Sequence, residues 1–228
     1  MDRRVCFCLL TLSLLSSVVA QEETYIALGG KLDLEPDTSA VSKPINSILW
    51  KHGANMVVEW FQGTPVVYYG QFKDRTELAT STGQLVINNL AINDGGVYSV
   101  EFNNYLQIKK YKIILISEVP KPTVLLQPLA CDSSSPFCTL SCDGNTTNAE
   151  PVTYSWSTDG GAWEESTQLK DITNDDKWQR VEKISCQITN PIGHKASEPH
   201  DNPFWSGGDT GSAPPADDPQ QGKSSQFL

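Results

Sequence analysis

The sequence lacks the features that most enzymes and nucleic-acid-binding proteins need. It has three histidines, His52, His194 and His200, and none lies in a motif with a nucleophile or a carboxylate partner. It contains no glycine-rich phosphate loop, no G-x-S-x-G and no H-E-x-x-H. Lys and Arg form no stripe and the net charge is −10, so nothing favours binding to nucleic acid. We expect a protein that is not an enzyme, has no cofactor and takes no small-molecule substrate.

A hydrophobic run long enough to cross a membrane is also missing. The apolar run at residues 5–19 follows a short basic head and is shorter than the roughly 20 residues that a spanning helix needs. Small residues at 17–20 suit cleavage after Ala20. We therefore predict a secretory signal peptide over residues 1–20 and an extracellular, secreted chain.

Cysteines are few, and four of the six lie between Cys131 and Cys186. In an oxidising compartment such a group indicates disulfides, whereas zinc is disfavoured because there is no C-x-x-C and no histidine nearby. No metal site is therefore expected.

Short segments of strand-forming residues, separated by turn residues, fill the first domain, which we place at residues 21–117. A hairpin turn is expected at residues 52–55, and a turn of one residue at Asn103 or Asn104. The expected strands are residues 25–28, 31–35, 45–51, 56–61, 65–69, 76–78, 84–87, 97–102 and 106–116.

The segment Asp94-Gly95-Gly96-Val97-Tyr98-Ser99-Val100 is close to Asp-x-Gly-x-Tyr-x-Cys, which is typical of strand F of an immunoglobulin domain. Val100 stands where the cysteine is expected, and Leu34 is the counterpart on strand B. We expect these two residues to fill the space of the missing disulfide, with Trp50 packed over them. The extra strand at residues 65–69 indicates a variable-type domain.

The second domain, predicted at residues 118–200, keeps its cysteines. Cys142, Trp156 and Cys186 follow the order of an immunoglobulin core, so a Cys142–Cys186 disulfide is expected. Cys131 and Cys138 are left to pair with each other; alternatively, one or both stay free or pair between chains. The predicted fold class is thus all-β, with two tandem immunoglobulin-like β-sandwiches: a variable-type one without a disulfide, then a constant-type one with a disulfide.

Two polar or proline-containing segments flank the second domain. Two prolines make residues 117–122 a short, stiff linker. Residues 201–228 hold too little apolar surface to offset the entropy of ordering, so a disordered polar tail is expected there.

Taken together, these motifs resemble the signalling lymphocytic activation molecule (SLAM) family, in particular its short two-domain leukocyte counter-receptors in a form seen in fishes. The resemblance covers nearly all of residues 21–200. It rests on residues 47–53, 58–60, 69–76, 85–90 and 94–100 of the first domain, and on 138–142, 154–156, Cys186, Asn190 and Pro191 of the second.

The chain departs from the family pattern in three places. It has no cysteine after Cys186, and Ile184 stands where the tyrosine of a tyrosine corner is expected. A polar tail follows residues 202–205, near which the family normally continues into a membrane anchor. This departure predicts a soluble splice form or a gene model with the wrong last exon.

The resemblance implies a function as a leukocyte adhesion or co-receptor ectodomain that modulates immune-cell activation. The partner would be another immunoglobulin-superfamily cell-surface protein, homophilic or heterophilic, and family members lie at the external side of the plasma membrane. The alternatives are a secreted decoy or regulator of the same interaction and, less favoured, a scaffold without a cell-surface partner.

The resemblance also implies a binding face on strands C, C′, F and G of the first domain. The candidate residues are Lys51, Glu59, Glu101, Asn103 and Lys109, with Lys110 as an alternative to Lys109. An ordinary solvated face is the other interpretation of these charges. Trp60, Tyr68 and Tyr69 are candidates either for anchors or for core packing.

One glycosylation sequon occurs, at Asn145-Thr146-Thr147, in a polar loop after strand B of the second domain. We expect Asn145 to carry a glycan.

Overall fold

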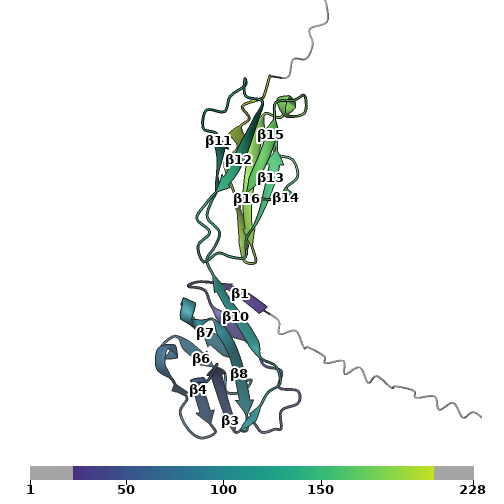
Figure 1. The fold of residues 1–228 in the computed structure, drawn as a ribbon. Helices are drawn as coiled ribbons and strands as arrows, with labels where there is room; N and C mark the ends of the chain where they lie inside the picture. Colours follow the sequence, from purple (N-terminus) through teal and green to yellow (C-terminus); the bar gives the residue numbers. More distant parts are fainter. Residues whose placement is uncertain (1–22, 208–228) are drawn as a thin grey trace, which may run out of the picture. The chain divides into compact units, whose positions relative to one another are not determined.

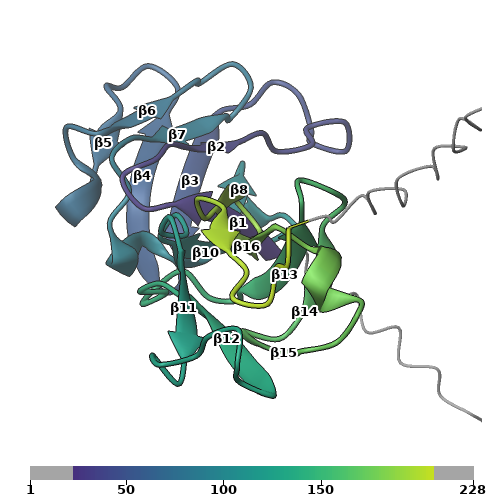
Figure 2. The same cartoon turned by 90° about the horizontal axis from the view of Figure 1, so that it is seen from above.

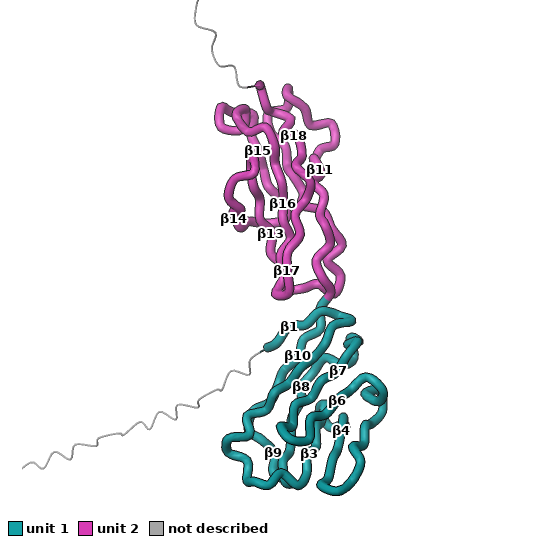
Figure 3. The backbone as a smooth tube through the Cα atoms, turned by 180° about the vertical axis from the view of Figure 1, so that it is seen from behind, with its two compact units in different colours: residues 1–116 teal, residues 117–228 magenta. Residues whose placement is uncertain are grey.

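The computed structural model describes residues 23–207, which form β-strands, short 3-10 turns and loops (Figure 1). The predicted signal peptide and residues 208–228 of the predicted tail lie outside the described residues. The chain divides into two compact units, residues 1–116 and 117–228, shown in two colours in Figure 3. The predicted all-β fold class is confirmed.

Unit 1 is a sandwich of two sheets. The larger sheet has the order β1-β10-β8-β3-β4-β5, and β9 pairs with β8. The smaller sheet has the order β2-β7-β6. β1 runs parallel to β10, whereas the other pairs are antiparallel. The strands are β1 (Glu23–Ala27), β2 (Leu32–Leu34), β3 (Ser47–His52), β4 (Asn55–Phe61), β5 (Val67–Tyr68), β6 (Thr76–Leu78), β7 (Leu85–Ile87), β8 (Gly96–Phe102), β9 (Tyr105–Leu106) and β10 (Tyr111–Ile116). Figure 2 shows β2, β6 and β7 together as a layer beside the larger sheet.

The core of unit 1 contains the apolar residues that take the place of a disulfide. Trp50 is fully buried and faces Val100 across the β3–β8 pair. Val100 and Leu34 are also buried in this cluster. The Trp50 indole Nε1 donates a hydrogen bond to the carbonyl of Gly83 at 2.8 Å. A Cβ on Gly83 would lie 2.4 Å from the Phe102 ring, so this close approach requires glycine.

The last hairpin of unit 1 differs from the expectation at its turn. The turn has two residues, Asn103 and Asn104, rather than one, and both have left-handed φ angles, of 52° and 67°. Two consecutive positive φ angles match the twist of antiparallel strands, and asparagine adopts them more readily than most residues.

The predicted single strand at residues 106–116 is wrong, because it is interrupted. The Gln107 N–H still donates to the carbonyl of Val100, whereas Tyr111 pairs with Tyr98. Residues 108–110 must therefore bulge out opposite one residue of β8. The bulge separates β9 from β10 and leaves Ile108 fully exposed.

A buried ion pair joins the two sheets of unit 1 at one end. Arg75 donates to both carboxylate oxygens of Asp94, at 2.6 and 2.7 Å, and Asp94 is only 1% exposed. The carboxylate also accepts the Ala91 N–H and the Gln71 amide. The Tyr98 hydroxyl donates to the Asp94 carbonyl at 2.8 Å. This fixes the segment η2 (Ile92–Asp94) that leads into β8.

The burial of this pair and its hydrogen bonds shift the pKa values of Asp94 and Tyr98. Burial alone would raise the pKa of Asp94, but the hydrogen bonds from Arg75, Ala91 and Gln71 outweigh that effect and hold it below its ordinary value. Burial, with the nearby Asp94 charge, raises the pKa of Tyr98 well above its usual range.

Unit 2 is also a sandwich of two sheets. One has the order β11-β12-β15, and the other has the order β14-β13-β16-β17, with β18 also paired to β16. The strands are β11 (Thr123–Gln127), β12 (Phe137–Asp143), β13 (Thr153–Thr158), β14 (Glu164–Ser166), β15 (Leu169–Thr173), β16 (Lys183–Asn190), β17 (Gly193–Ala196) and β18 (His200–Asp201).

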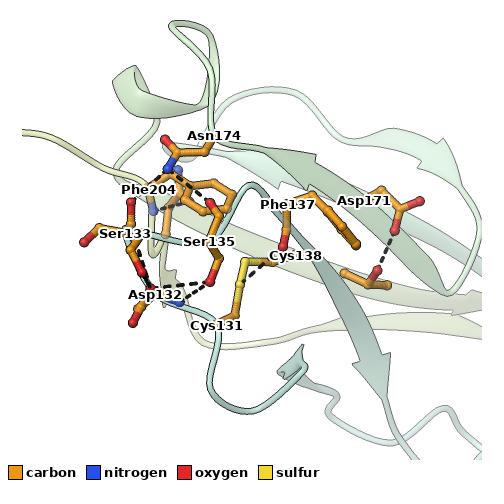
Figure 4. Close-up of a disulfide and its surroundings, with 12 residues drawn as sticks. Cys131, Asp132, Ser133, Ser135, Phe137, Cys138, Asp171, Asn174 and Phe204 are labelled. Atoms are coloured by element: carbon orange, nitrogen blue, oxygen red, sulfur yellow. Dashed lines mark hydrogen bonds between the residues drawn. A yellow bond between two sulfur atoms is a disulfide. The ribbon is translucent and has the colours of Figure 1, made fainter.

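Two disulfides lie in unit 2. Cys142 on β12 is bonded to Cys186 on β16, with a Cα–Cα distance of 5.9 Å, so the bridge crosses between the sheets. Trp156 faces Cys186 across the β13–β16 pair and is buried. Cys131 is bonded to Cys138, which closes the loop between β11 and β12 (Figure 4).

The proline segment between the predicted domains is built into unit 2. The Ser117 N–H donates to the carbonyl of Asn148 at 2.6 Å, and its carbonyl accepts the Asn190 side-chain amide. Val119 is buried in the core of unit 2. Residues 117–122 are therefore held by hydrogen bonds and apolar contacts as well as by proline geometry.

The second unit continues past the boundary predicted at residue 200. Phe204 is buried in the core, and the buried Asn202 amide donates to the carbonyls of Trp178 and Val181. Sequence composition misses these residues because one phenylalanine and one asparagine anchor an otherwise polar segment. Ile184, at the place of the expected tyrosine, is fully buried.

Reduction of the disulfides should affect the two units unequally. The closed loop between Cys142 and Cys186 is long, so its loss should lower the free energy of unfolding of unit 2 by about 4 kcal/mol. Residues 23–116 contain no cysteine, so unit 1 should keep its stability. Hydrogen exchange measured peptide by peptide, with and without reductant, separates the units.

A matched control for reduction is the double variant Cys131→Ala/Cys138→Ala, which keeps the long bridge. In this variant the free energy of unfolding of unit 2 should fall by only about 2 kcal/mol, because the loop closed by Cys131 and Cys138 is short. Equal loss of protection in both units on reduction would contradict the prediction.

Asp94→Asn should destabilise unit 1 by about 3 kcal/mol, because it leaves the Arg75 guanidinium without its charged partner.

The Arg75–Asp94 pair should also make unit 1 sensitive to acid. The folded pKa of Asp94 lies below its ordinary value of 3.8, so its stabilising contribution is present above pH 3.8 and is lost as the pH falls through the folded value. Hydrogen exchange in unit 1 between pH 2.5 and 7 measures both effects. An Asp94→Asn variant that shows the same acid-induced loss as the wild type would refute this origin.

Candidate partner-binding face

The outer surface of the larger sheet in unit 1 is formed by alternate residues of β3, β4 and β8. Trp50 and Val100 point into the core, so their neighbours Lys51 and Glu101 point outward. Leu49 pairs with Glu59 on one side and with Glu101 on the other. We call Leu49, Lys51, Glu59, Glu101 and Leu106 the outer face of unit 1.

Lys51 and Glu101 form an ion pair within this face. The Lys51 Nζ lies 2.5 Å from the Glu101 carboxylate, and the side chains are 31% and 22% exposed. Lys51 pairs with Ser99 on β8, and Glu101 lies two residues further along that strand on the same face, so the two side chains are diagonal neighbours. The pair is thus partly shielded yet open to a partner on its outer side.

Glu59, on β4, has a neutral partner rather than a basic one. The Tyr69 hydroxyl donates to Glu59 Oε2 at 2.9 Å. This hydrogen bond raises the pKa of Tyr69, because loss of its proton would place two negative charges side by side. Glu59 therefore adds a negative charge that no cation in the face balances, next to the balanced Lys51–Glu101 pair.

Asn103 has a different role from the one expected of it. Its side-chain oxygen accepts the N–H groups of Asn46 and Ser47 at 2.7 and 3.2 Å, and its amide donates to the carbonyls of Ser42 and Pro44. A side-chain amide has two donor hydrogens and two acceptor lone pairs, so these four bonds occupy it fully. Asn103 thus ties the β8–β9 turn to the loop before β3, and its place in a binding face stays a prediction.

Lys109 lies apart from the charged centre of the face. Its Nζ stands 4.9 Å from the ring centroid of Tyr111, whose ring packs against Trp50 on the core side of the sheet. A hollow of about 220 Å³ beside Lys109 is lined partly by Pro36 and Asp37. The structure therefore brings together Lys51, Glu59 and Glu101, and it separates Asn103 and Lys109 from them.

Two apolar members of the face escaped the sequence-based prediction. Leu49 lies between the carboxylates of Glu59 and Glu101, and Leu106 pairs with Glu101 from β9 and is exposed. The outward position of Leu49 follows from its place between the core residues Ile48 and Trp50. Leu106 could not be placed, because the bulge that follows it has no clear sequence signal.

The aromatic candidates divide between core and face. Trp60 and Tyr68 pack against the core of unit 1, whereas Tyr69 reaches Glu59 through its hydroxyl. His52 stacks on Tyr98 at 4.7 Å, and its Nε2 is hydrogen-bonded to the Gly95 carbonyl. Over residues 23–207, no group of three or more His, Cys, Asp or Glu is placed to hold a metal ion.

Asn145 is exposed in the loop after β12, where its side-chain oxygen accepts the Thr147 N–H at 3.0 Å. Glycosylation of Asn145 stays a prediction.

No family model matches the chain. Human lymphocyte function-associated antigen 3 is 25% identical over 158 residues, which are 68% of this chain and 60% of that protein. The chain thus matches three fifths of the length of this relative.

Solved structures with the same fold include immunoglobulin-type proteins of several kinds. The CD2-binding domain of CD58 (lymphocyte function-associated antigen 3) matches with a TM-score of 0.59 and 19% identity, over 78% of this chain and 95% of that one. Murine CEACAM1b gives a TM-score of 0.62 and 16% identity, over 78% and 94% of the chains. Bovine butyrophilin gives 0.54 and 14%, over 79% and 94%.

These comparisons show the immunoglobulin fold and a similarity to a lymphocyte function-associated antigen. The prediction of a non-enzymatic protein agrees with these relatives, none of which is named as an enzyme. No helix within residues 23–207 has the length and apolar character to cross a membrane.

Asn103→Ala should destabilise unit 1 by about 3 kcal/mol, because it removes four hydrogen bonds and places alanine at a left-handed φ. Asn104→Ala is the matched control. It carries the same backbone penalty at the next residue, so it should cost about 1 kcal/mol. Urea unfolding gives both values, and hydrogen exchange should rise at residues 42–47 in the Asn103 variant alone. Equal losses in the two variants would refute the role of the side chain.

Proposed function

We propose that the chain is a leukocyte adhesion or co-receptor ectodomain of the SLAM type. It binds an immunoglobulin-superfamily protein on another cell through the outer face of unit 1, and this contact modulates immune-cell activation. The observation that carries the proposal is the arrangement of Lys51, Glu101 and Glu59 around Leu49 on one exposed sheet surface.

The chemistry of this face supports selective and reversible binding. Charges of both signs on a surface steer the approach of a partner and reject partners with the wrong pattern, more than they add affinity. Lys51 and Glu101 already neutralise each other, so a charged group of a partner must either replace one of them in the pair or bind beside the pair. Leu49 and Leu106 give the face a small apolar part that can be buried on contact.

The similarity to lymphocyte function-associated antigen 3 supports the leukocyte setting, because its solved structure is described as CD2-binding. The motifs shared with the SLAM family support the finer placement. The local Cys131–Cys138 bridge and the absence of a cysteine after Cys186 set this chain apart from the usual pattern of that family.

The test is to stain live blood leukocytes with fluorescent multimers of the mature chain. Multimers are needed because avidity reveals contacts too weak to survive as monomers. The test variant reverses three charges: Lys51→Glu, Glu101→Lys and Glu59→Lys. Reversal of Lys51 and Glu101 together keeps an ion pair within the sheet, so the fold is retained while the outward pattern changes. We expect the wild type to stain a leukocyte subset and the variant to lose about tenfold or more of that signal.

The matched control makes the same change in net charge at the opposite, smaller sheet: Lys31→Glu just before β2, Asp33→Lys on β2 and Glu77→Lys on β6. This control should stain as the wild type does. Equal loss with both variants, or no staining of any cell by folded wild type, would overturn the proposal.

A further inference from the structure

The outer surface of the three-stranded sheet in unit 2 is defined by its register. Cys138, Leu140, Cys142 and Ile172 point into the core and are buried. The residues between them, and their partners on β11 and β15, therefore point outward. We call the following ten residues the outer face of unit 2: Thr123, Leu125, Gln127, Phe137, Thr139, Ser141, Asp143, Leu169, Asp171 and Thr173.

This face carries large apolar side chains in the open. Leu125 and Leu169 are 42% and 49% exposed, and they flank Ser141 in one row across the three strands. Ser141 is buried although it points outward, which shows that its neighbours cover it. Phe137, at the start of β12, is 59% exposed.

The opposite sheet of the same unit gives an internal comparison. The outward positions of β13 and β16 that pair with each other are small or polar: Thr153, Ser155, Ser157, Ser185, Gln187 and Thr189. The paired outward positions of β13 and β16 are thus serine, threonine and glutamine, with Trp163 before β14 exposed beside them, while the three-stranded sheet exposes two leucines and a phenylalanine. Exposed apolar groups gathered on one surface are typical of a contact with another protein.

The charges on the outer face of unit 2 have one sign. Asp143 and Asp171 are its two charged residues, and none of the ten positions holds a lysine, arginine or histidine. The nearest basic residue before β11, Lys121, is already paired with Glu198. Lys170, on β15, lies over the Trp178 ring on the other side of the sheet.

The end of the face that contains Phe137 is held by a disulfide and by hydrogen bonds. The Cys131–Cys138 bridge closes the loop next to Phe137, and the Asn174 amide donates to the carbonyls of Ser133 and Ser135 (Figure 4). Asp171 accepts a hydrogen bond from the Thr139 hydroxyl at 2.6 Å, which fixes the direction of its carboxylate. A surface held in place in this way loses little entropy when a partner binds.

We propose that the outer face of unit 2 is a second protein-binding surface, separate from the outer face of unit 1. Its partner is a protein surface that combines exposed apolar side chains with lysine or arginine. The apolar side chains cover Leu125, Leu169 and Phe137, and the basic groups meet the carboxylates of Asp143 and Asp171.

A second copy of the same face does not meet these requirements. Two copies in contact would bring four carboxylates together without a cation, and like charges across an interface oppose association. The charge pattern therefore favours a different, basic partner over self-association.

The test uses three synthetic peptides that differ in one feature. The first peptide repeats the sequence Leu-Ser-Lys-Ser. In an extended strand its leucine and lysine side chains lie on one side and its serine side chains on the other. In the second and third, serine or glutamate replaces lysine. Fluorescence anisotropy measures their binding to the mature chain with both disulfides intact. The lysine peptide should bind most tightly, and its affinity should fall about tenfold between 0.05 and 0.5 M salt because salt screens the charges.

Three variants locate the binding. Asp143→Asn/Asp171→Gln and Leu125→Ser/Leu169→Ser should each weaken binding of the lysine peptide by about tenfold. Glu164→Gln/Glu165→Gln is the matched control, because it removes two exposed carboxylates from β14 in the other sheet and should leave binding unchanged. Hydrogen exchange checks that the variants fold. If Leu125→Ser/Leu169→Ser is unstable, Asp143→Asn/Asp171→Gln alone locates the site.

Two results would overturn the proposal. If the β14 control weakens binding as much as Asp143→Asn/Asp171→Gln, the peptide follows the net charge of the chain and not this face. If sedimentation shows a wild-type dimer that Leu125→Ser/Leu169→Ser disrupts, the occupant is a second copy rather than a basic partner.

Discussion

The packing of Trp50 against Val100 and the neighbouring core is the contact on which unit 1 depends. In this sandwich no covalent bond crosses between the sheets, so apolar contacts and the hydrogen bond from Trp50 to the Gly83 carbonyl hold the centre. Because strand residues alternate between the two sides of a sheet, the inward position of Trp50 fixes the outward position of Lys51, and that of Val100 fixes Glu101. A shift of one residue in register would bury both charges.

The two units hold their sheets together by different means. Unit 2 has the Cys142–Cys186 bridge, which restricts the unfolded chain and so stabilises the fold whatever the pH. Unit 1 has instead the bidentate Arg75–Asp94 pair, backed by the Tyr98 hydroxyl. An ion pair of this kind depends on protonation, whereas a disulfide depends on the redox conditions, so the two halves of one chain respond to different stresses.

Much of this architecture could be predicted from the sequence, because it follows from local patterns. The alternation around Trp50 and Cys142 gave the strands that form the two cores, and the Cys-Trp-Cys order led to the long disulfide. The bulge after Gln107 could not be predicted, since it depends on how β10 packs rather than on a local residue preference. The role of Asn103 was also out of reach, because its partners lie some sixty positions earlier in the chain.

The outer faces of the two units differ in how their charges are satisfied, and this difference bears on what each can bind. In unit 1 Lys51 and Glu101 are already paired, so a partner that contacts them exchanges one set of charge contacts for another, and the net gain in free energy is small. We expect such a face to select between partners without binding any of them tightly. In unit 2 the carboxylates of Asp143 and Asp171 have no cation on their face, and a basic partner there makes contacts that the free protein lacks. We therefore propose that electrostatic attraction contributes more directly to binding at the second face, and that the first face mainly selects between partners.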